Sequence, residues 1–365
     1  MGKMIPLVKT NIPPREILMP RLEEVLYSGY VAQGEKVEEF ERDFASFIGK
    51  GYSLSLNSGT AALHIALILA GVKHGDEVIS TPMTAEPTNV AIKMAGANIC
   101  WADVDYDTGN IDPQSVEKRI TEKTKAIMVV DYAGIPVNIA AFKSISRTHG
   151  IPIIEDAAHA LGAKFGGIKC GAHFPYTVFS FQAIKHLTTI DGGALELSSL
   201  EDYENGKLIR WFGIDKKLSR LDNNIVMQGY KYHMNNVNAT IGLVQLSVIQ
   251  KIIDAHVTNG KYFDKVLANT PGVELIRYYP GSEPSYWLYT MKVDNRAEFI
   301  RKLNDHGIMA SELHKRNDLH TFLNDTHGVL PNMDRFYEKL VHIPCGWWVD
   351  EEQRDKIAKV IRSGW

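Results

Sequence analysis

The chain has 365 residues, 45% hydrophobic and 23% charged, which is usual for a globular protein and long enough for two or three domains of roughly 150 residues. Lysine and arginine number 40 against 43 aspartates and glutamates, so the net charge of −3 excludes the basic footprint of a nucleic-acid-binding protein. No apolar run reaches the ~18 residues of a membrane-spanning helix, so we expect no membrane partner.

Short apolar strands alternate with helices over the first part of the chain. The expected strands are Tyr52–Leu56, Glu77–Ser80, Ile99–Ala102, Lys125–Asp131 and Ile151–Ile154. The expected helices are Ser58–Ala70, Pro87–Met94, Pro113–Ile120 and Ile139–His149. Unbroken apolar strands are buried on both faces, and strands separated by helices pair in parallel. The pattern predicts an α/β fold with a mostly parallel central sheet covered by helices.

The alternation ends after the fifth of these strands. Two short strands, Thr177–Phe181 and Ala194–Leu197, precede one long helical stretch, Val237–Leu267, which has a regular apolar face. The segments expected beyond it are the strands Val273–Arg277 and Tyr286–Val293 and the helices Arg296–Asn304 and Glu351–Ile361. We predict a large α/β domain over residues 1–250 and a small C-terminal α+β domain over residues 251–365.

The cysteines and the N-terminal segment bear on localisation. Cys100, Cys170 and Cys345 are odd in number, far apart and without metal-binding spacing, so neither a disulfide framework nor a metal site is expected. The N-terminal segment lacks the apolar stretch of a secretory signal. A reducing compartment fits these features, and we expect a cytoplasmic protein.

The first motif with chemical potential is Asn57-Ser58-Gly59-Thr60, where a strand ends and a helix begins. A helix N-terminus offers free N–H groups and a partial positive charge, which suit a phosphate. Gly59 allows close approach to the backbone, and Thr60 adds a hydroxyl. Taken alone, the motif is better explained by Ser58 as a helix N-cap.

The second and third motifs carry ionisable groups. Glu155 and Asp156 end a buried strand, and ligands bind at the carboxyl ends of strands in open α/β sheets. Asp156 is equally well explained as a cation-binding carboxylate or as a helix cap. Lys185 lies between apolar residues and a Thr-Thr…Gly-Gly turn. Most lysines are solvated, but a partly buried lysine has a lowered pKa and can act as a nucleophile or base.

Together, and in this order, the motifs supply a phosphate cradle, a pyridinium partner and an amine that can capture an aldehyde. The chain resembles the DegT/DnrJ/EryC1/StrS family of pyridoxal-phosphate-dependent sugar aminotransferases, which have the fold type I architecture. The resemblance covers nearly the whole chain. Outside the three motifs it rests on residues 28–41, beginning Ser-Gly-Tyr-Val-Ala-Gln-Gly, and on residues 229–246, beginning Gly-Tyr-Lys-Tyr-His-Met-Asn.

The resemblance implies roles for individual residues. Lys185 matches the lysine that forms the internal aldimine with pyridoxal 5′-phosphate and moves the proton during transamination. Asp156 matches the acid that partners the pyridine nitrogen. The other implied cofactor-binding residues are Gly59, Thr60 and Ser180 at the phosphate, His159 near the phenolic oxygen and Gln182 beside the cofactor.

The sequence departs from the family pattern at three places. Ala85 stands where an aromatic residue usually stacks on the cofactor ring, and Met83 or His159 could replace that contact. Lys231 stands where an asparagine usually reaches the phosphate in the neighbouring subunit, a role that a lysine could also fill. The segment His314–His320 replaces the usual tyrosine- and proline-containing stretch, and we expect a solvated loop there rather than a contact with the sugar nucleotide.

The resemblance implies transfer of an amino group from an amino acid, expected to be L-glutamate, to a nucleotide-linked keto sugar. The reaction would be ping-pong with pyridoxamine phosphate as the intermediate. It would serve the biosynthesis of amino sugars for lipopolysaccharide, other surface polysaccharides or glycosides, in a homodimer with shared active sites.

Two alternatives stay open. One is a dehydratase of the same family, in which histidine replaces the lysine, and the other is a non-catalytic regulator that binds pyridoxal phosphate or a sugar nucleotide. The spacing from Lys185 to the Thr-Thr and Gly-Gly pairs places Lys185, and not His186, at the anchor position. That spacing favours transamination, and the intact lysine and acid favour catalysis over binding alone.

Overall fold

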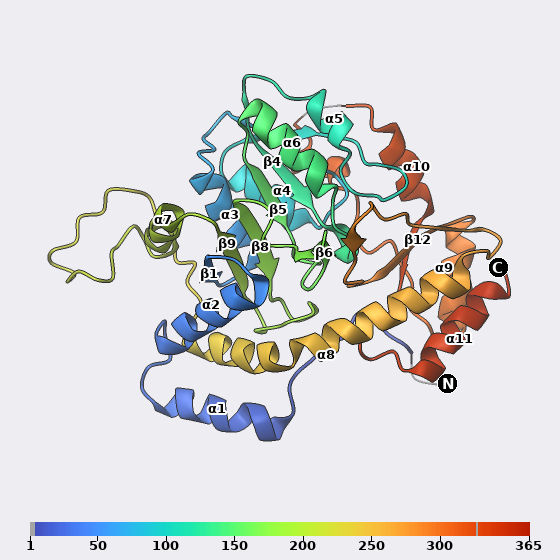
Figure 1. Ribbon diagram of the computed structural model, residues 1–365, viewed down its shortest axis with the longest axis horizontal. Helices are drawn as coiled ribbons and strands as arrows, with labels where there is room; N and C mark the ends of the chain where they lie inside the picture. The colour runs from blue at the N-terminus through green and yellow to red at the C-terminus, as the bar shows by residue number, and fades with distance from the viewer. Residues whose placement is uncertain (1–3, 326–327) are drawn as a thin grey trace.

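Seven strands form the central sheet, in the order β1-β9-β8-β5-β4-β2-β3 (Figure 1). The structure, a computed structural model, describes residues 4–325 and 328–365. The strands are β1 (Tyr52–Leu56), β2 (Glu77–Ser80), β3 (Asn98–Trp101), β4 (Thr124–Val130), β5 (Ile153–Asp156), β8 (Tyr176–Ser180) and β9 (Gly193–Leu197). The pairs from β8 through β3 are parallel, whereas β9 runs antiparallel to both of its neighbours. The predicted mostly parallel α/β sheet is confirmed.

Helices cover both faces of the sheet. One face packs against α3 (Gly59–Leu69), α4 (Glu86–Met94) and α7 (Leu200–Arg210), and their apolar side chains share one core. The other face packs against α2 (Glu35–Ile48), α5 (Pro113–Glu117), α6 (Ile139–His149) and the first half of α8 (Asn236–Leu267). Because side chains alternate along a strand, Ile154 and Asp156 face α3 and α4, whereas Ile153 and Glu155 face the opposite core.

A second antiparallel sheet, β10-β12-β13, organises the C-terminal part of the chain. Its strands are β10 (Val273–Leu275), β12 (Tyr289–Val293) and β13 (Leu340–Ile343), and its apolar core includes residues of α8, α9 (Arg296–Asp305) and α11 (Glu351–Arg362). Ile5, near the N-terminus, joins the same core and pairs with Ile308. Helix α8 runs without interruption beneath both parts (Figure 1). The division of the chain near residue 250 stays a prediction.

The remaining elements are short or peripheral. Helix α1 (Arg15–Tyr27) packs on α8, and α10 (Pro331–Lys339) precedes β13. Strands β6 (Lys164–Phe165), β7 (Ile168–Lys169) and β11 (Ser282–Glu283) form a small antiparallel sheet. Three 3-10 turns cover Tyr132–Gly134, Asn317–Leu319 and Thr321–Leu323. Among the described residues, no helix combines the length and the apolar character needed to cross a membrane.

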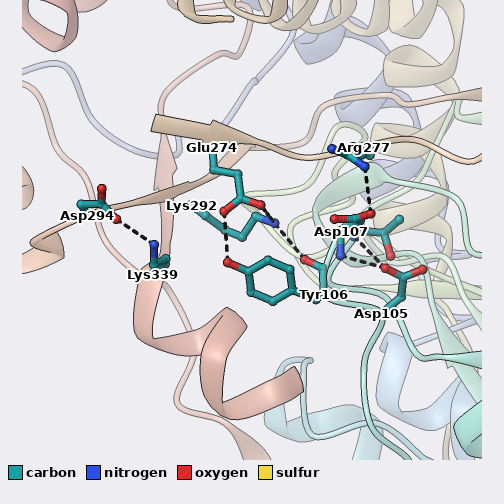
Figure 2. Close-up of polar contacts among 9 residues, drawn as sticks. Asp105, Tyr106, Asp107, Glu274, Arg277, Lys292, Asp294 and Lys339 are labelled. Carbon is teal, nitrogen blue, oxygen red and sulfur yellow. Dashed lines mark hydrogen bonds and ion pairs between the residues drawn. The ribbon is translucent and has the colours of Figure 1, made fainter. Parts of the chain in front are cut away.

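A buried lysine connects the two sheets. Lys292 on β12 is fully buried, and its Nζ donates hydrogen bonds to the Tyr106 carbonyl at 2.9 Å and to Glu274 at 2.6 Å (Figure 2). Tyr106 follows β3, and its ring lies 3.8 Å from Nζ while its hydroxyl donates to the same glutamate. Buried charges persist only when they are paired and hydrogen-bonded, so this contact fixes the C-terminal sheet against the loop after β3.

A row of polar side chains crosses the buried α2/α6 face of the central sheet. Ser53, Glu196 and Thr177 are neighbours in the register of β1, β9 and β8, and Thr177 in turn pairs with Glu155. Glu196 is fully buried, and burial raises its pKa from the ordinary 4.5 to about 8, with Ser53 and Lys50 offsetting only part of that cost. At neutral pH this carboxyl is therefore protonated in the folded protein.

Glu196→Gln is expected to make the stability of the protein less sensitive to a rise in pH from about 5 to 9. The unfolded chain loses this proton at about pH 4.5 and the folded protein at about 8, so the wild type loses stability as the pH rises across that window. The slope is about 1.4 kcal/mol per pH unit. Relative to the wild type, the variant should gain up to about 4 kcal/mol in unfolding free energy between about pH 5 and pH 9. A difference between the two proteins that stays constant with pH would contradict the assignment.

Candidate active site

A cavity of about 410 Å³ opens at the carboxyl ends of the central strands, between the sheet and the N-termini of α3 and α4. This is the position at which open α/β sheets bind ligands. Eight of the nine predicted site residues line it: Gly59, Thr60, Ala85, Asp156, His159, Ser180, Gln182 and Lys185. Lys185 is the only lysine or arginine among the described lining residues.

Lys185 follows β8 in a short loop that returns to β9. Its Nζ lies 4.1 Å from the centre of the Trp287 ring, and Trp287 in turn donates a hydrogen bond from its indole to the Ile184 carbonyl at 3.0 Å. The side chain reaches the cavity but lies deep within the fold. Burial lowers its pKa from 10.5 to about 7, and the charge of Asp156 opposes the shift. A large fraction of Lys185 is therefore an uncharged, nucleophilic amine at neutral pH.

The loop after Lys185 is strained. Ile190 adopts a φ of +73°, which is unusual for a β-branched residue. Two neighbouring hydroxyls hold this turn, since Thr188 accepts from the Ile190 N–H at 2.9 Å and Thr189 donates to the Asp191 carbonyl at 2.9 Å. The Thr-Thr pair thus fixes the return of the chain to Gly192.

Asp156 ends β5 and is almost fully buried. Its Oδ2 accepts a hydrogen bond from the Thr88 hydroxyl at 2.7 Å, and its Oδ1 accepts from the Ala158 N–H at 3.1 Å. Burial raises the pKa of the carboxyl, while both hydrogen bonds and the charge of Lys185 lower it. The site thus places one carboxylate and one amine in a single cavity.

The N-terminus of α3 faces the cavity from the end of β1. Ser58 caps the helix by accepting from the Ala61 N–H at 3.1 Å, so the expected N-cap is present. Gly59 lies against Ser180, and a Cβ at Gly193 would lie 2.6 Å from the Ser58 backbone. The close approach of the three segments requires these small residues, and the remaining N–H groups of the first turn can meet an anion.

His159 lines the cavity beside Lys185, and the buried Trp287 packs against both residues. Their rings stack at 3.9 Å with an interplanar angle of 18°, and His314 lies parallel to His159 at 6.2 Å. Burial and the charge of Lys185 lower the pKa of His159 well below its ordinary value and that of His314 to about 4, so both imidazoles are neutral.

The structure corrects two sequence expectations. His314 lines the cavity and is half-buried, so a purely solvated loop was the wrong interpretation of that residue. Its neighbours there, His159 and Glu86, are more than 100 residues away in the sequence. Met83 is buried in the core beneath α3 and α4 and does not line the cavity, so it does not replace the aromatic residue missing at Ala85.

Lys231 lies outside this cavity. It is exposed, pairs with Trp211, and accepts a hydrogen bond at its carbonyl from the Asn57 side chain at 3.2 Å. Its role toward a neighbouring subunit stays a prediction. Sequence reasoning also missed Thr88 and Trp287, and only Thr88 carried a usable signal, as a hydroxyl in the first turn of a helix that starts at the sheet edge.

The residues present fit pyridoxal phosphate. They offer an uncharged amine for an aldehyde, a carboxylate for a ring nitrogen and a helix N-terminus for a phosphate, all around one cavity. The neutral imidazoles of His159 and His314 supply flat surfaces for a ring.

The comparisons with known proteins agree with this chemistry. The DegT/DnrJ/EryC1/StrS aminotransferase family matches residues 15–362. The UDP-4-amino-4,6-dideoxy-N-acetyl-beta-L-altrosamine transaminase of Campylobacter jejuni serotype O:2 is 32% identical over 94% of this chain and 92% of its own length.

Solved structures extend the comparison. The sugar aminotransferase CalS13 from Micromonospora echinospora superposes with a TM-score of 0.96 at 37% identity, covering 99% of this chain and 100% of that chain. Spr1654 from Streptococcus pneumoniae, described as a putative sugar aminotransferase and solved in PLP and PMP forms, has TM-scores of 0.91 and 0.90 at 27% identity, with 99% of this chain and 97–98% of those chains covered. The chain belongs to the DegT/DnrJ/EryC1/StrS aminotransferase family, with the fold type I architecture, and is a pyridoxal-phosphate-dependent aminotransferase.

Proposed function

We propose that the protein transfers an amino group from L-glutamate to a nucleotide-linked keto sugar, with Lys185 as the catalytic amine. The observation that carries this proposal is the cavity in which Lys185, with a pKa of about 7, and Asp156 lie together. The relatives described above as sugar aminotransferases, including one acting on a UDP-linked amino sugar, support the substrate class.

Each residue of the cavity has its own role in the proposed reaction. The bound cofactor supplies an electron-accepting ring. Asp156 holds the proton on the ring nitrogen through its carboxylate. Lys185 Nζ would hold the cofactor through its aldehyde and, as a free amine, would carry the proton between the amino donor and the cofactor. Gly59 and Thr60 at the start of α3, with the Ser180 hydroxyl, bind the phosphate, while His159 and Trp287 exclude water beside the amine.

The structure also bears on the dehydratase alternative. His186 does not line the cavity; it is buried, and its ring packs against His256 at 4.4 Å. Burial and the neighbouring His256 lower its pKa well below the ordinary value. The anchor position is thus left to Lys185, which supports transamination.

A homodimer with shared sites is part of the proposal. Apolar side chains are exposed on α1 and on the loop over residues 212–229, which projects from the body of the protein (Figure 1). Leu221 is 97% exposed and Val226 73% exposed, and monomeric proteins seldom leave such side chains clustered in water. Lys231 follows this loop, so a second chain packed there could receive it. Among the described lining residues, Lys185 is the one lysine or arginine, so in this proposal the neighbouring chain supplies the positive charges that bind the substrate phosphates.

The function is tested with the pyridoxal phosphate-loaded protein, glutamate and a panel of keto sugars linked to UDP, GDP, dTDP or CDP, with a free cyclitol ketone included. We expect glutamate to bleach the visible cofactor absorbance and at least one keto sugar nucleotide to restore it and leave aminated. If glutamate leaves the visible absorbance of the bound cofactor unchanged, the result would favour the non-catalytic regulator instead. The proposal includes a cytoplasmic location and a place in the biosynthesis of amino sugars for surface polysaccharides or glycosides.

The shared site is tested by complementation. Lys185→Ala and Lys231→Ala are each expected to be poorly active, the second through weak cofactor retention. A mixed dimer with one substitution on each chain should regain one intact site, and hence up to about half of the wild-type activity per dimer. A mixture that stays as inactive as its parents, although heterodimers are shown to form, would contradict the exchange of Lys231.

A further inference from the structure

A chain of buried hydroxyls leads to Asp156 from the helix that covers the cavity. The Thr84 and Thr88 hydroxyl oxygens lie 2.8 Å apart, and the Thr88 oxygen lies 2.7 Å from Asp156 Oδ2. Both threonines are 2% exposed. An ionised carboxylate can only accept, so Thr88 donates its single proton to Asp156 and Thr84 must donate to Thr88. The chain therefore has one direction.

This direction matters because Asp156 is buried. Burial favours the neutral carboxylic acid, which would point a proton rather than a lone pair at the cavity. Hydrogen bonds to the charged form oppose this, and successive hydroxyls that point the same way strengthen one another. The Ala158 N–H donates to the other oxygen, so both oxygens of the carboxylate are held by hydrogen bonds.

The C-terminal part of the chain holds the hydroxyl pair in place. Asn317, fully buried, donates from its side chain to the Thr84 carbonyl at 2.9 Å and from its backbone to the Pro82 carbonyl at 2.9 Å. Asn89 completes the clamp by donating to the Asn317 side chain at 2.8 Å. All of these polar groups are paired, so the segment before α4 has little freedom to turn its hydroxyls away.

We propose that Thr88 is a positioning residue, whose hydroxyl, oriented by Thr84, keeps the Asp156 carboxylate ionised and directed at the cavity. Thr88 acts through Asp156, so this proposal rests on the role proposed above for that residue. Thr84 and Thr88 thereby have a role that no sequence motif indicated. The C-terminal Asn317 likewise becomes part of the support for a catalytic group on the central sheet.

The test is Thr88→Val, which keeps the shape and removes the hydroxyl. In the apo-protein, carbon NMR of labelled aspartate should show a higher pKa for Asp156 than in the wild type. The dissociation constant for pyridoxal phosphate should rise by about 10- to 100-fold, the worth of a hydrogen bond to a charged group. Turnover should fall at unchanged KM for both substrates. Thr84→Val should produce the same changes to a smaller degree.

Two variants separate positioning from stability alone. Thr88→Ser keeps the hydroxyl and should restore the wild-type Asp156 pKa and cofactor affinity, even if it unfolds more easily. Thr81→Val removes another buried hydroxyl on the same segment, one that accepts only from the Met83 N–H, and should leave cofactor affinity unchanged. A Thr88→Val protein with the wild-type Asp156 pKa and cofactor affinity would overturn the proposal. If the affinity changes as expected but no keto sugar is aminated by the wild type, the proposed function fails and the positioning role stands.

Discussion

Replacing Lys185 with alanine should lower kcat by roughly 10³- to 10⁶-fold, as the loss of a catalytic nucleophile does in other enzymes. The side chain sits in the cavity with its Nζ over the Trp287 ring, and burial gives it a pKa of about 7. Lys185 is the one lysine among the described lining residues, so we expect no other described lysine to take over from it. The measurement is transfer from glutamate to an accepted keto sugar, with circular dichroism to verify the fold.

The same amine predicts a pH dependence in the apo-protein. Because only the uncharged form attacks an aldehyde, the rate at which the apo-protein captures pyridoxal phosphate should rise with pH through about 7 and then level off. Lys185→Arg is the matched control, since it keeps a cation but has no nucleophilic amine at these pH values, and it should show no covalent capture. Borohydride reduction followed by mass spectrometry locates the adduct. An adduct on a lysine other than 185 would remove the basis of the proposed chemistry.

Asp156→Asn is expected to reduce kcat by about 10²- to 10⁴-fold, the range for loss of one strong electrostatic contact or one proton-holding group. The amide keeps the shape, but its single oxygen can accept from only one of Thr88 and Ala158, and the neutral group cannot balance a protonated ring nitrogen. Affinity for pyridoxal phosphate should fall as well. Both quantities are measured by cofactor titration and by transfer assays at saturating substrate.

Glu155→Gln is the control for Asp156→Asn. Glu155 is the preceding residue on β5, but the alternation of the strand turns it into the opposite core, where it accepts from the Thr177 hydroxyl at 2.7 Å and the Gly171 N–H at 3.1 Å. Its substitution can alter stability but should leave cofactor affinity near that of the wild type. Equal losses in both variants would show that the strand as a whole, rather than the Asp156 carboxylate, supports the site.

Most of the central sheet was predictable because its strands have strong local signals. Tyr52–Leu56, Glu77–Ser80 and helix Ile139–His149 have the predicted bounds. The antiparallel direction of β9 was not predicted, since it depends on the tight return after Lys185 that places Gly193 against the start of α3. Helices α1, α2, α7 and α10 lie outside the predicted strand–helix alternation and were also missed.

The sequence by itself determined the groups of the candidate site that stand next to a strand end or a helix start. Gly59, Asp156 and Lys185 belong to this class. For each of them, five or six consecutive residues indicate both the side-chain chemistry and the strand end or helix start beside it. The sequence therefore predicted which chemical groups lie at one edge of the sheet.

Only the tertiary structure decided what surrounds those atoms. Thr88 meets Asp156 across 68 residues of sequence. His314 reaches the cavity from the C-terminal part of the chain, and Trp287 from the same part packs against Lys185. The lowered pKa of Lys185 likewise comes from burial by these distant segments and not from its neighbours in the chain. A pKa depends on the dielectric surroundings and on charges within a few ångströms, and no local sequence pattern specifies either of them before the chain has folded.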